Sequence, residues 1–132
     1  MLLTKEFTFD AAHNLVAYHG KCERLHGHTY RMAVTVSGNP DEEGMIVDFI
    51  ELKAIVKQEV LDKFDHAYLN DIIPQPTAEY IARYVFERLD PRVRAENRAL
   101  HSVQIWETAT SSATFFRDDL DFPATGSGAA SC

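Results

Sequence analysis

The stretch GHTYRMAVTVSG, residues 27–38, decides the fold because apolar and polar side chains alternate along it. Side chains two positions apart on a β-strand project to the same face. The apolar face here carries Tyr30, Met32, Val34 and Val36. The stretch LTKEFTFDAAH, residues 3–13, alternates in the same way, with an apolar face made of Phe7, Phe9 and Ala11. The two stretches therefore predict paired strands that turn one face toward the core.

The middle of the chain changes to a helical period. After the turn SGNPDEEG and a short strand end in MIVDF, Asp48 is the expected N-cap of a helix, with Glu51 completing a capping box. Thr77 is the expected N-cap of a second helix, which we expect to stop around Pro91.

Two more strands are predicted toward the C-terminus. They are LHSVQIWETA, residues 100–109, and ATFFRDDL, residues 113–120, after a Ser-Ser turn. The predicted order is strand-strand-helix-helix-strand-strand. Hairpins at both ends imply an antiparallel sheet with the two helices packed on one face, which is an α+β fold.

Length and composition predict a single domain over residues 1–120 and a flexible Gly/Ser/Ala-rich tail over residues 121–132. No apolar run approaches the roughly 18 residues that a membrane span needs. The formal net charge of −7 disfavours a general nucleic-acid binder, which needs many Lys and Arg to neutralise phosphates. The N-terminus lacks the pattern of a signal peptide. We therefore expect a cytoplasmic protein in which Cys22 is a free thiol.

Three histidines share the apolar parity of the first two strands. His26 and His28 lie two positions apart, and His13 ends the preceding strand. If the strands pair as a hairpin, three imidazoles from adjacent strands form a facial set. Such a set suits Zn²⁺ with a fourth position open to water or substrate. Imidazoles that simply hydrogen-bond to backbone groups are the alternative, and the third in-phase histidine favours the metal.

Cys22 lies four positions before the His-Gly-His pair and has three interpretations. It is a fourth zinc ligand, a small buried apolar residue, or a reactive thiol beside the cations Lys21 and Arg24. In the third case Asp65 and His66 supply the rest of a catalytic set, because a carboxylate that orients an imidazole lets it relay a proton. The same residues are equally compatible with an ordinary capped helix end.

Glu107 follows Val103 and Ile105 on the inward parity of its strand. A carboxylate on an apolar face needs a partner. It either reaches water at the strand end or anchors a ligand through two parallel hydrogen bonds to an amidine-like edge. Guanine and pterin rings present such an edge.

Six motifs occur in an order that resembles the 6-pyruvoyltetrahydropterin synthase family: FDAAH, CERLHGH, VDF, FDHAYLND, PTAE and ETATSSATF. The resemblance covers about residues 3–118. It implies the tunnelling (T-) fold, with the order of strands and helices predicted above. It also implies self-association into a barrel, as trimers or dimers of trimers, with active sites between subunits. The partner is then a small pterin, with no nucleic acid and no membrane.

The resemblance further implies a role for particular residues. The implied zinc ligands are His13, His26 and His28. The implied catalytic set is Cys22 as the proton-abstracting thiolate, completed by Asp65 and His66. The implied substrate contacts are Glu107 as the anchor of the pterin ring, Thr108, Thr77 from a neighbouring subunit, and Asp48 and Phe49 across the interface.

The short spacing Cys-x3-His-Gly-His resembles the queuosine-pathway branch, 6-carboxy-5,6,7,8-tetrahydropterin synthase. The implied reaction turns 7,8-dihydroneopterin triphosphate into 6-carboxytetrahydropterin, acetaldehyde and triphosphate, with Lys21 and Arg24 as candidate triphosphate contacts. The nearest alternative is 6-pyruvoyltetrahydropterin synthase, which retains the side chain. Two other classes stay open: a zinc hydrolase that does not need Cys22, and a binding module stabilised by zinc.

Overall fold

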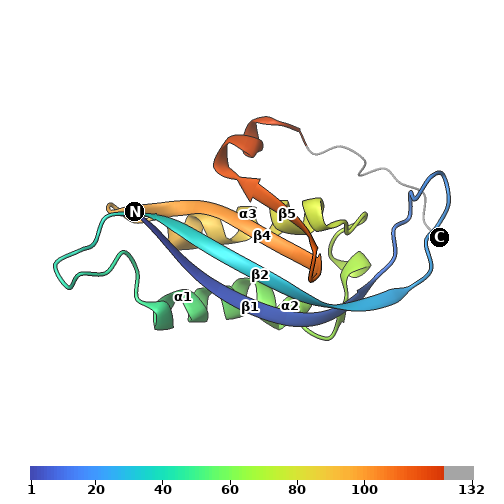
Figure 1. The fold of residues 1–132 in the computed structure, drawn as a ribbon, viewed down its shortest axis with the longest axis horizontal. Helices are drawn as coiled ribbons and strands as arrows, with labels where there is room; N and C mark the ends of the chain where they lie inside the picture. The colour runs from blue at the N-terminus through green and yellow to red at the C-terminus, as the bar shows by residue number, and fades with distance from the viewer. Residues whose placement is uncertain (124–132) are drawn as a thin grey trace.

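The computed structural model describes residues 1–123, so most of the predicted tail lies outside the described residues. The strands form one sheet in the order β3-β1-β2-β4-β5, and the helices lie along one face of it (Figure 1). The elements are β1 (Leu2–His13), β2 (His26–Gly38), α1 (Phe49–Val56), α2 (Asp62–Phe64), β3 (Ala67–Tyr68), α3 (Ala78–Val93), β4 (Arg98–Thr108) and β5 (Ser111–Phe116). The predicted α+β fold is confirmed.

The β1–β2 hairpin has the register that the alternation requires. Phe9 pairs with Tyr30, and His13 pairs with His26, so both strands turn the same parity to the helices. That face is apolar over most of its length and largely buried, whereas the intervening side chains, apart from Ala33, are exposed or half-buried. Burial of each large apolar side chain contributes about 1.5–3 kcal/mol to folding, which fixes the register and with it the positions of the histidines.

The helices supply the other half of the core. Leu52 and Val56 of α1, and Ile81, Val85 and Leu89 of α3, are buried against the sheet. The Asp48 and Thr77 side chains cap the two helices as predicted. None of the described helices is long and apolar enough to cross a membrane.

Two predictions about strands are wrong. The segment MIVDF is not a strand, because the carbonyl oxygen of Ile46 accepts from the side chains of Asn97, at 3.3 Å, and Arg98, at 3.2 Å, instead of from a neighbouring strand. The Ser-Ser pair starts β5 rather than forming the turn, since it already pairs with the end of β4.

The helices and the sheet edge also depart from expectation. Helix α3 continues through Pro91 to Val93, because a proline in the last turn costs little more than one backbone hydrogen bond. A π turn, Lys57–Leu61, interrupts the first helix between α1 and α2. Strand β3 pairs in parallel with β1 through Ala11 and Ala67, which adds one parallel pair to a sheet predicted to be antiparallel.

Candidate active site and metal centre

Three imidazoles meet at one end of the β1–β2 hairpin. His13, His26 and His28 each place one ring nitrogen within 4.8 Å of the others. Their ring centroids lie 4.7, 5.1 and 4.8 Å apart. The predicted convergence of these side chains, hereafter the histidine cluster, is therefore confirmed as geometry.

The protonation of two cluster members follows from their backbone contacts. His13 Nδ1 lies 2.8 Å from the Pro76 carbonyl oxygen, and His26 Nδ1 lies 2.8 Å from that of Arg24. A carbonyl oxygen only accepts, so each Nδ1 donates its proton, which makes Nε2 the nitrogen that can offer a lone pair to a metal. These two Nε2 atoms are 3.1 Å apart. Facing lone pairs repel unless a cation or a proton lies between them, which is the arrangement expected of a metal site.

His28 completes the cluster with a nitrogen that lacks a hydrogen bond. Its Nε2 is buried and has no hydrogen-bond partner among the described residues, and the nearest carboxylate oxygen, Glu107 Oε1, lies 3.5 Å away. Burial lowers the pKa of His28, Glu107 opposes the shift, and the neighbouring imidazoles of His13 and His26 add to it. A neutral imidazole with a free lone pair is the form that binds a metal.

Tyr30 forms the floor of the cluster, a role that the sequence did not suggest. Its ring stacks on Phe9 at a centroid distance of 5.0 Å and meets His28 edge-on at 5.4 Å. Burial, together with the carboxylates of Glu107 and Glu23, raises the pKa of Tyr30, so the hydroxyl keeps its proton. The only available signal was that Tyr30 shares the parity of the histidines, and that parity also predicts the core.

Asp65 and His66, hereafter the Asp–His dyad, are brought together at the edge of β1. The His66 Nδ1 atom lies 3.1 Å from Asp65 Oδ2, and the Asp10 backbone N–H donates to Asp65 Oδ1 at 3.0 Å. The Asp10 hydrogen bond and then the contacts with His66 lower the pKa of Asp65. An ionised carboxylate that orients an imidazole is the arrangement expected of a proton-transfer pair. His66 has a φ of 60°, a left-handed conformation often found at functional positions.

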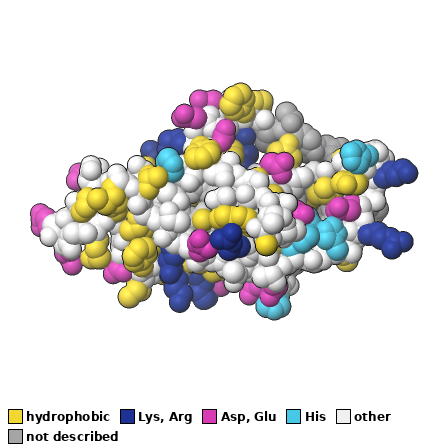
Figure 2. All heavy atoms as spheres, in the orientation of Figure 1, with side chains coloured by type: hydrophobic (Ala, Val, Ile, Leu, Met, Phe, Trp, Pro, Cys, Tyr) yellow, Lys and Arg dark blue, Asp and Glu magenta, His cyan; other side chains and the backbone are white. Residues whose placement is uncertain are grey.

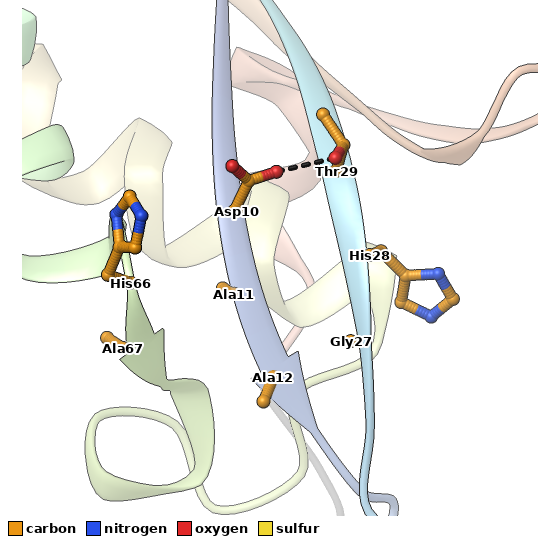
Figure 3. A pocket seen from close by; sticks show the side chains of 8 residues that line it. All are labelled: Asp10, Ala11, Ala12, Gly27, His28, Thr29, His66 and Ala67. Carbon is orange, nitrogen blue, oxygen red and sulfur yellow. Dashed lines mark hydrogen bonds between the residues drawn. The ribbon is translucent and has the colours of Figure 1, made fainter.

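The dyad and the histidine cluster lie on opposite faces of the β1–β2 hairpin. A cavity of about 510 Å³ includes Asp10, Thr29 and His66 in its lining. Figure 3 shows these side chains around the cavity, with Thr29 donating to Asp10 at 2.5 Å, while the His28 ring points away from them. A single chain therefore does not bring the dyad to the cluster.

Cys22 stands apart from both groups. It lies in the exposed β1–β2 link, with Sγ 3.9 Å from the Val16 carbonyl oxygen. Cys22 is disulfide-bonded in this structure, so the prediction of a free thiol is wrong for this state of the chain. An oxidising environment suffices to form such a bond.

Of the predicted substrate contacts, Glu107 contacts the histidine cluster, and Thr108 and Thr77 each follow a residue that contacts it. Glu107 faces His28, and Thr108 is the last residue of β4. Thr77 follows Pro76, whose carbonyl holds His13 of the same chain, and its hydroxyl accepts from the Tyr80 N–H at 3.2 Å. Thr77 was expected to reach the substrate from a neighbouring subunit, and the structure also places it next to the cluster of its own chain.

Asp48 and Phe49 are far from that cluster within one chain. The ring of Phe49 lies 5.9 Å from the Lys5 ammonium. Lys5 and His13 are eight positions apart on β1, which corresponds to about 26 Å at the rise of a strand. Asp48 and Phe49 line a separate cavity of about 460 Å³ beside the start of β1.

Charge is unevenly distributed over the surface. Figure 2 shows histidine and Lys or Arg side chains together at the end of the molecule formed by the β1–β2 link. Lys21 and Arg24 belong to that link. Local cations are thus present beside the histidine cluster although the chain as a whole is acidic.

Comparison with known proteins gives consistent matches over nearly the whole chain. The family model described as 6-pyruvoyl tetrahydropterin synthase matches residues 2–118. The 6-carboxy-5,6,7,8-tetrahydropterin synthase of Haemophilus influenzae is 38% identical and aligns 83% of this chain with 94% of its own. The protein of that name from Synechocystis is 43% identical, and the match covers 90% of this chain and 95% of that protein. The solved structure of Caenorhabditis elegans 6-pyruvoyl tetrahydropterin synthase matches with a TM-score of 0.73 at 27% identity, covering 88% of this chain and 94% of that one.

Proposed function

The chain belongs to the 6-pyruvoyl tetrahydropterin synthase family, and we propose that it is a zinc-dependent carbon–carbon lyase of the queuosine-pathway branch. In this reaction 7,8-dihydroneopterin triphosphate and one water give 6-carboxy-5,6,7,8-tetrahydropterin, acetaldehyde and triphosphate. The relatives that are 38% and 43% identical carry the name of this activity. The observation that carries the proposal is the set of three imidazoles whose ring nitrogens lie within 4.8 Å of one another.

The residues of the histidine cluster fit zinc. Two of the three imidazoles have their Nδ1–H groups held by backbone carbonyls, which leaves Nε2 as the ligand atom. The third, His28, has a buried Nε2 without a hydrogen bond in the described part of the chain. Zinc bound there acts as a Lewis acid toward oxygens of the substrate side chain and stabilises developing negative charge.

The substrate would be held beside this cluster by Glu107. Its carboxylate faces His28 and can accept two parallel hydrogen bonds from the amidine-like edge of a pterin. Thr108, and Thr77 of a neighbouring subunit, would contact the same ring. Lys21 and Arg24 would attract the triphosphate, since a polyanion needs only a few local cations.

Proton transfer would be divided between Cys22 and the Asp–His dyad. In its reduced form Cys22 is the base that removes a proton from the substrate side chain, because a thiolate and not a disulfide sulfur can accept it. His66 relays protons, and ionised Asp65 holds its ring in place. This requirement for a reduced sulfur agrees with a cytoplasmic location for the working enzyme.

The active site would be completed by a second copy of the chain. The dyad lies on the face of β1–β2 opposite the cluster, and Asp48 and Phe49 lie about 26 Å along β1 from it. A neighbouring subunit brings such distant groups together when the interface is heterologous. We therefore propose a ring of subunits, a trimer or a dimer of trimers, in which each site combines residues of two chains.

The test is product analysis with zinc-loaded, reduced protein and 7,8-dihydroneopterin triphosphate. The proposal expects acetaldehyde and 6-carboxytetrahydropterin from the wild type and neither from Cys22→Ala. Formation of 6-pyruvoyltetrahydropterin without acetaldehyde would instead indicate the sister activity. Full activity of Cys22→Ala would indicate a zinc hydrolase, and unfolding on chelation would indicate a structural metal.

A further inference from the structure

The hydroxyl of Tyr30 is buried without a hydrogen-bond partner among the described residues, and the proposed zinc site does not explain why. Its side chain is 0% exposed, and the oxygen has no hydrogen-bond partner within residues 1–123. Folded proteins pair nearly all buried polar groups, so an unpaired one calls for an explanation. The other buried side-chain atom without a partner in this region is His28 Nε2, and a metal ligated there explains that atom.

The ring of Tyr30 lies beside the histidine cluster, edge-on to the rings of His13 and His28. Two carboxylates act on the phenol, those of Glu107 and Glu23. Glu107 lies 3.5 Å from His28 Nε2, and Glu23 lies 3.9 Å from His26 Nδ1. The two carboxylates therefore lie on different sides of the cluster.

The ring of Tyr30 is held in place by its neighbours. It stacks on Phe9 with an interplanar angle of 13° and meets the rings of His13 and His28 edge-on, at centroid distances of 6.0 and 5.4 Å. Little rotation of the ring is possible in such packing. The hydroxyl is thus a fixed donor at the floor of the cluster.

A fixed donor in this position needs an oxygen to accept its hydrogen bond. The three imidazoles do not serve, because the hydroxyl has no hydrogen-bond partner among the described residues. We propose that Tyr30 is a substrate-binding residue whose hydroxyl donates a hydrogen bond to an oxygen on the side chain of the bound pterin. This inference rests on the proposed function, because it takes the ligand at the cluster to be a pterin with an oxygenated side chain.

Such a donor would select for the side chain rather than for the ring. A site built to hydrogen-bond a substrate hydroxyl discriminates strongly against a ligand without one, because its own polar group is then left unpaired. A pterin with a polyhydroxylated side chain would satisfy Tyr30, whereas a pterin with an alkyl group would not. Glu107, by contrast, would contribute equally to the affinity for both ligands, because both have the same ring edge.

The experiment compares Tyr30→Phe with wild type in binding two pterins to the zinc-loaded, reduced protein. The ligands are 7,8-dihydroneopterin, which carries a trihydroxypropyl side chain, and 6-methyl-7,8-dihydropterin, which has no side-chain oxygen. Tyr84→Phe is the matched control, because it removes a phenol hydroxyl from a ring that packs on Phe64 away from the cluster. Dissociation constants come from pterin fluorescence or calorimetry, and bound zinc is measured in parallel.

We expect Tyr30→Phe to bind dihydroneopterin about tenfold more weakly and the methyl compound about as tightly as wild type does, with zinc content unchanged. Tyr84→Phe should leave both constants unchanged. Equal weakening for both ligands, or no weakening for either, would overturn the inference. So would a failure of the wild type to bind either pterin. Wild-type binding without conversion of the triphosphate would overturn the proposed reaction alone.

Discussion

The histidine cluster and the Asp–His dyad differ in how much of each one chain completes. The cluster is assembled from two paired strands and a helix-capping segment, and His13 is 1% exposed. The dyad sits at a sheet edge, with the His66 side chain 79% exposed. One group is rigid and enclosed, and the other is oriented but open. Under the proposed function, the single chain would bind the metal, whereas proton transfer would require the assembly.

Packing explains why the two groups are built differently. A metal ligand must be held within a few tenths of an ångström, and burial between a sheet and helices supplies that restraint. A proton relay has to reach a substrate that enters from outside, and exposure at an edge leaves it accessible. The His66 backbone N–H donates to the Asp10 carbonyl oxygen, and the His66 ring contacts Asp65, so the imidazole is oriented without being enclosed.

The largest effects should separate the two groups. His28→Ala should lower kcat/KM by about 1,000-fold or more and abolish zinc binding, because a ligand is lost. His66→Ala should lower kcat by about 100- to 10,000-fold while zinc content and the thermal midpoint stay near wild type, since the side chain is exposed. Activity, metal analysis and calorimetry on the two variants check this. If His66→Ala also lost zinc, the histidine cluster and the Asp–His dyad would not have separate roles.

A smaller effect is expected at the edge of the cluster, where Glu107 meets His28. Glu107→Gln keeps the shape but loses the charge-assisted pair of hydrogen bonds to the pterin, so KM should rise about 10- to 100-fold with zinc still bound. Steady-state kinetics and metal content measure the two quantities together. A loss of zinc with unchanged KM would place Glu107 in the metal site instead.

The cations of the β1–β2 link should affect only the phosphorylated substrate. Charge reversal of both Lys21 and Arg24 to Glu should raise KM for 7,8-dihydroneopterin triphosphate about tenfold, and the effect should shrink as salt is added. Binding of unphosphorylated dihydroneopterin should not change. Equal weakening of both ligands would show that the link shapes the site rather than attracting phosphate.

The smallest effect concerns a contact that belongs to neither group. Asp90 accepts from Arg117 at 2.7 Å and from Arg94 at 3.0 Å. Burial alone would raise the pKa of Asp90, but the hydrogen bond and charge of Arg117, together with Arg94, lower it below the usual value. The folded state therefore holds the ionised form better than the unfolded state, and this stability is present above pH ~4 and lost as the pH falls through the lowered pKa.

Asp90→Asn should accordingly lose about 1 kcal/mol of unfolding free energy at neutral pH. The difference from wild type should disappear in acid, where the wild-type carboxyl is protonated. Urea unfolding at several pH values measures it. Zinc content and activity serve as controls and should be the same as in wild type.

Part of this architecture could be predicted from the sequence because it depends on local periodicity. Alternation in residues 3–13 and 27–38 was enough to place three histidines on one face, since a period of two admits only one parity for each strand. Strand β3 could not be predicted, because Ala67–Tyr68 is too short to show a pattern and its parallel pairing with β1 joins distant parts of the chain.

Other features depend on contacts that leave no trace in a single sequence. The separation of the dyad from the cluster follows from the hydrogen bonds between the Asp10 backbone and residues 65–66. The Pro76 and Arg24 carbonyls that orient two imidazoles carry no residue signature. Tyr30 was expected in the core and lies there, but its unpaired hydroxyl became visible only with its neighbours in place.

The central claim, that each active site combines the cluster and Cys22 of one chain with the dyad of another, can be tested by complementation. Cys22→Ala and His66→Ala should each be nearly inactive, and each retains the group that the other lacks. Unfolding and refolding them together in a one-to-one mixture, with zinc and reductant, should restore about a quarter of wild-type activity, because random assembly across a heterologous interface pairs the two intact groups in that fraction of sites. A mixture that stays inactive, although mass spectrometry shows mixed oligomers, would contradict the claim.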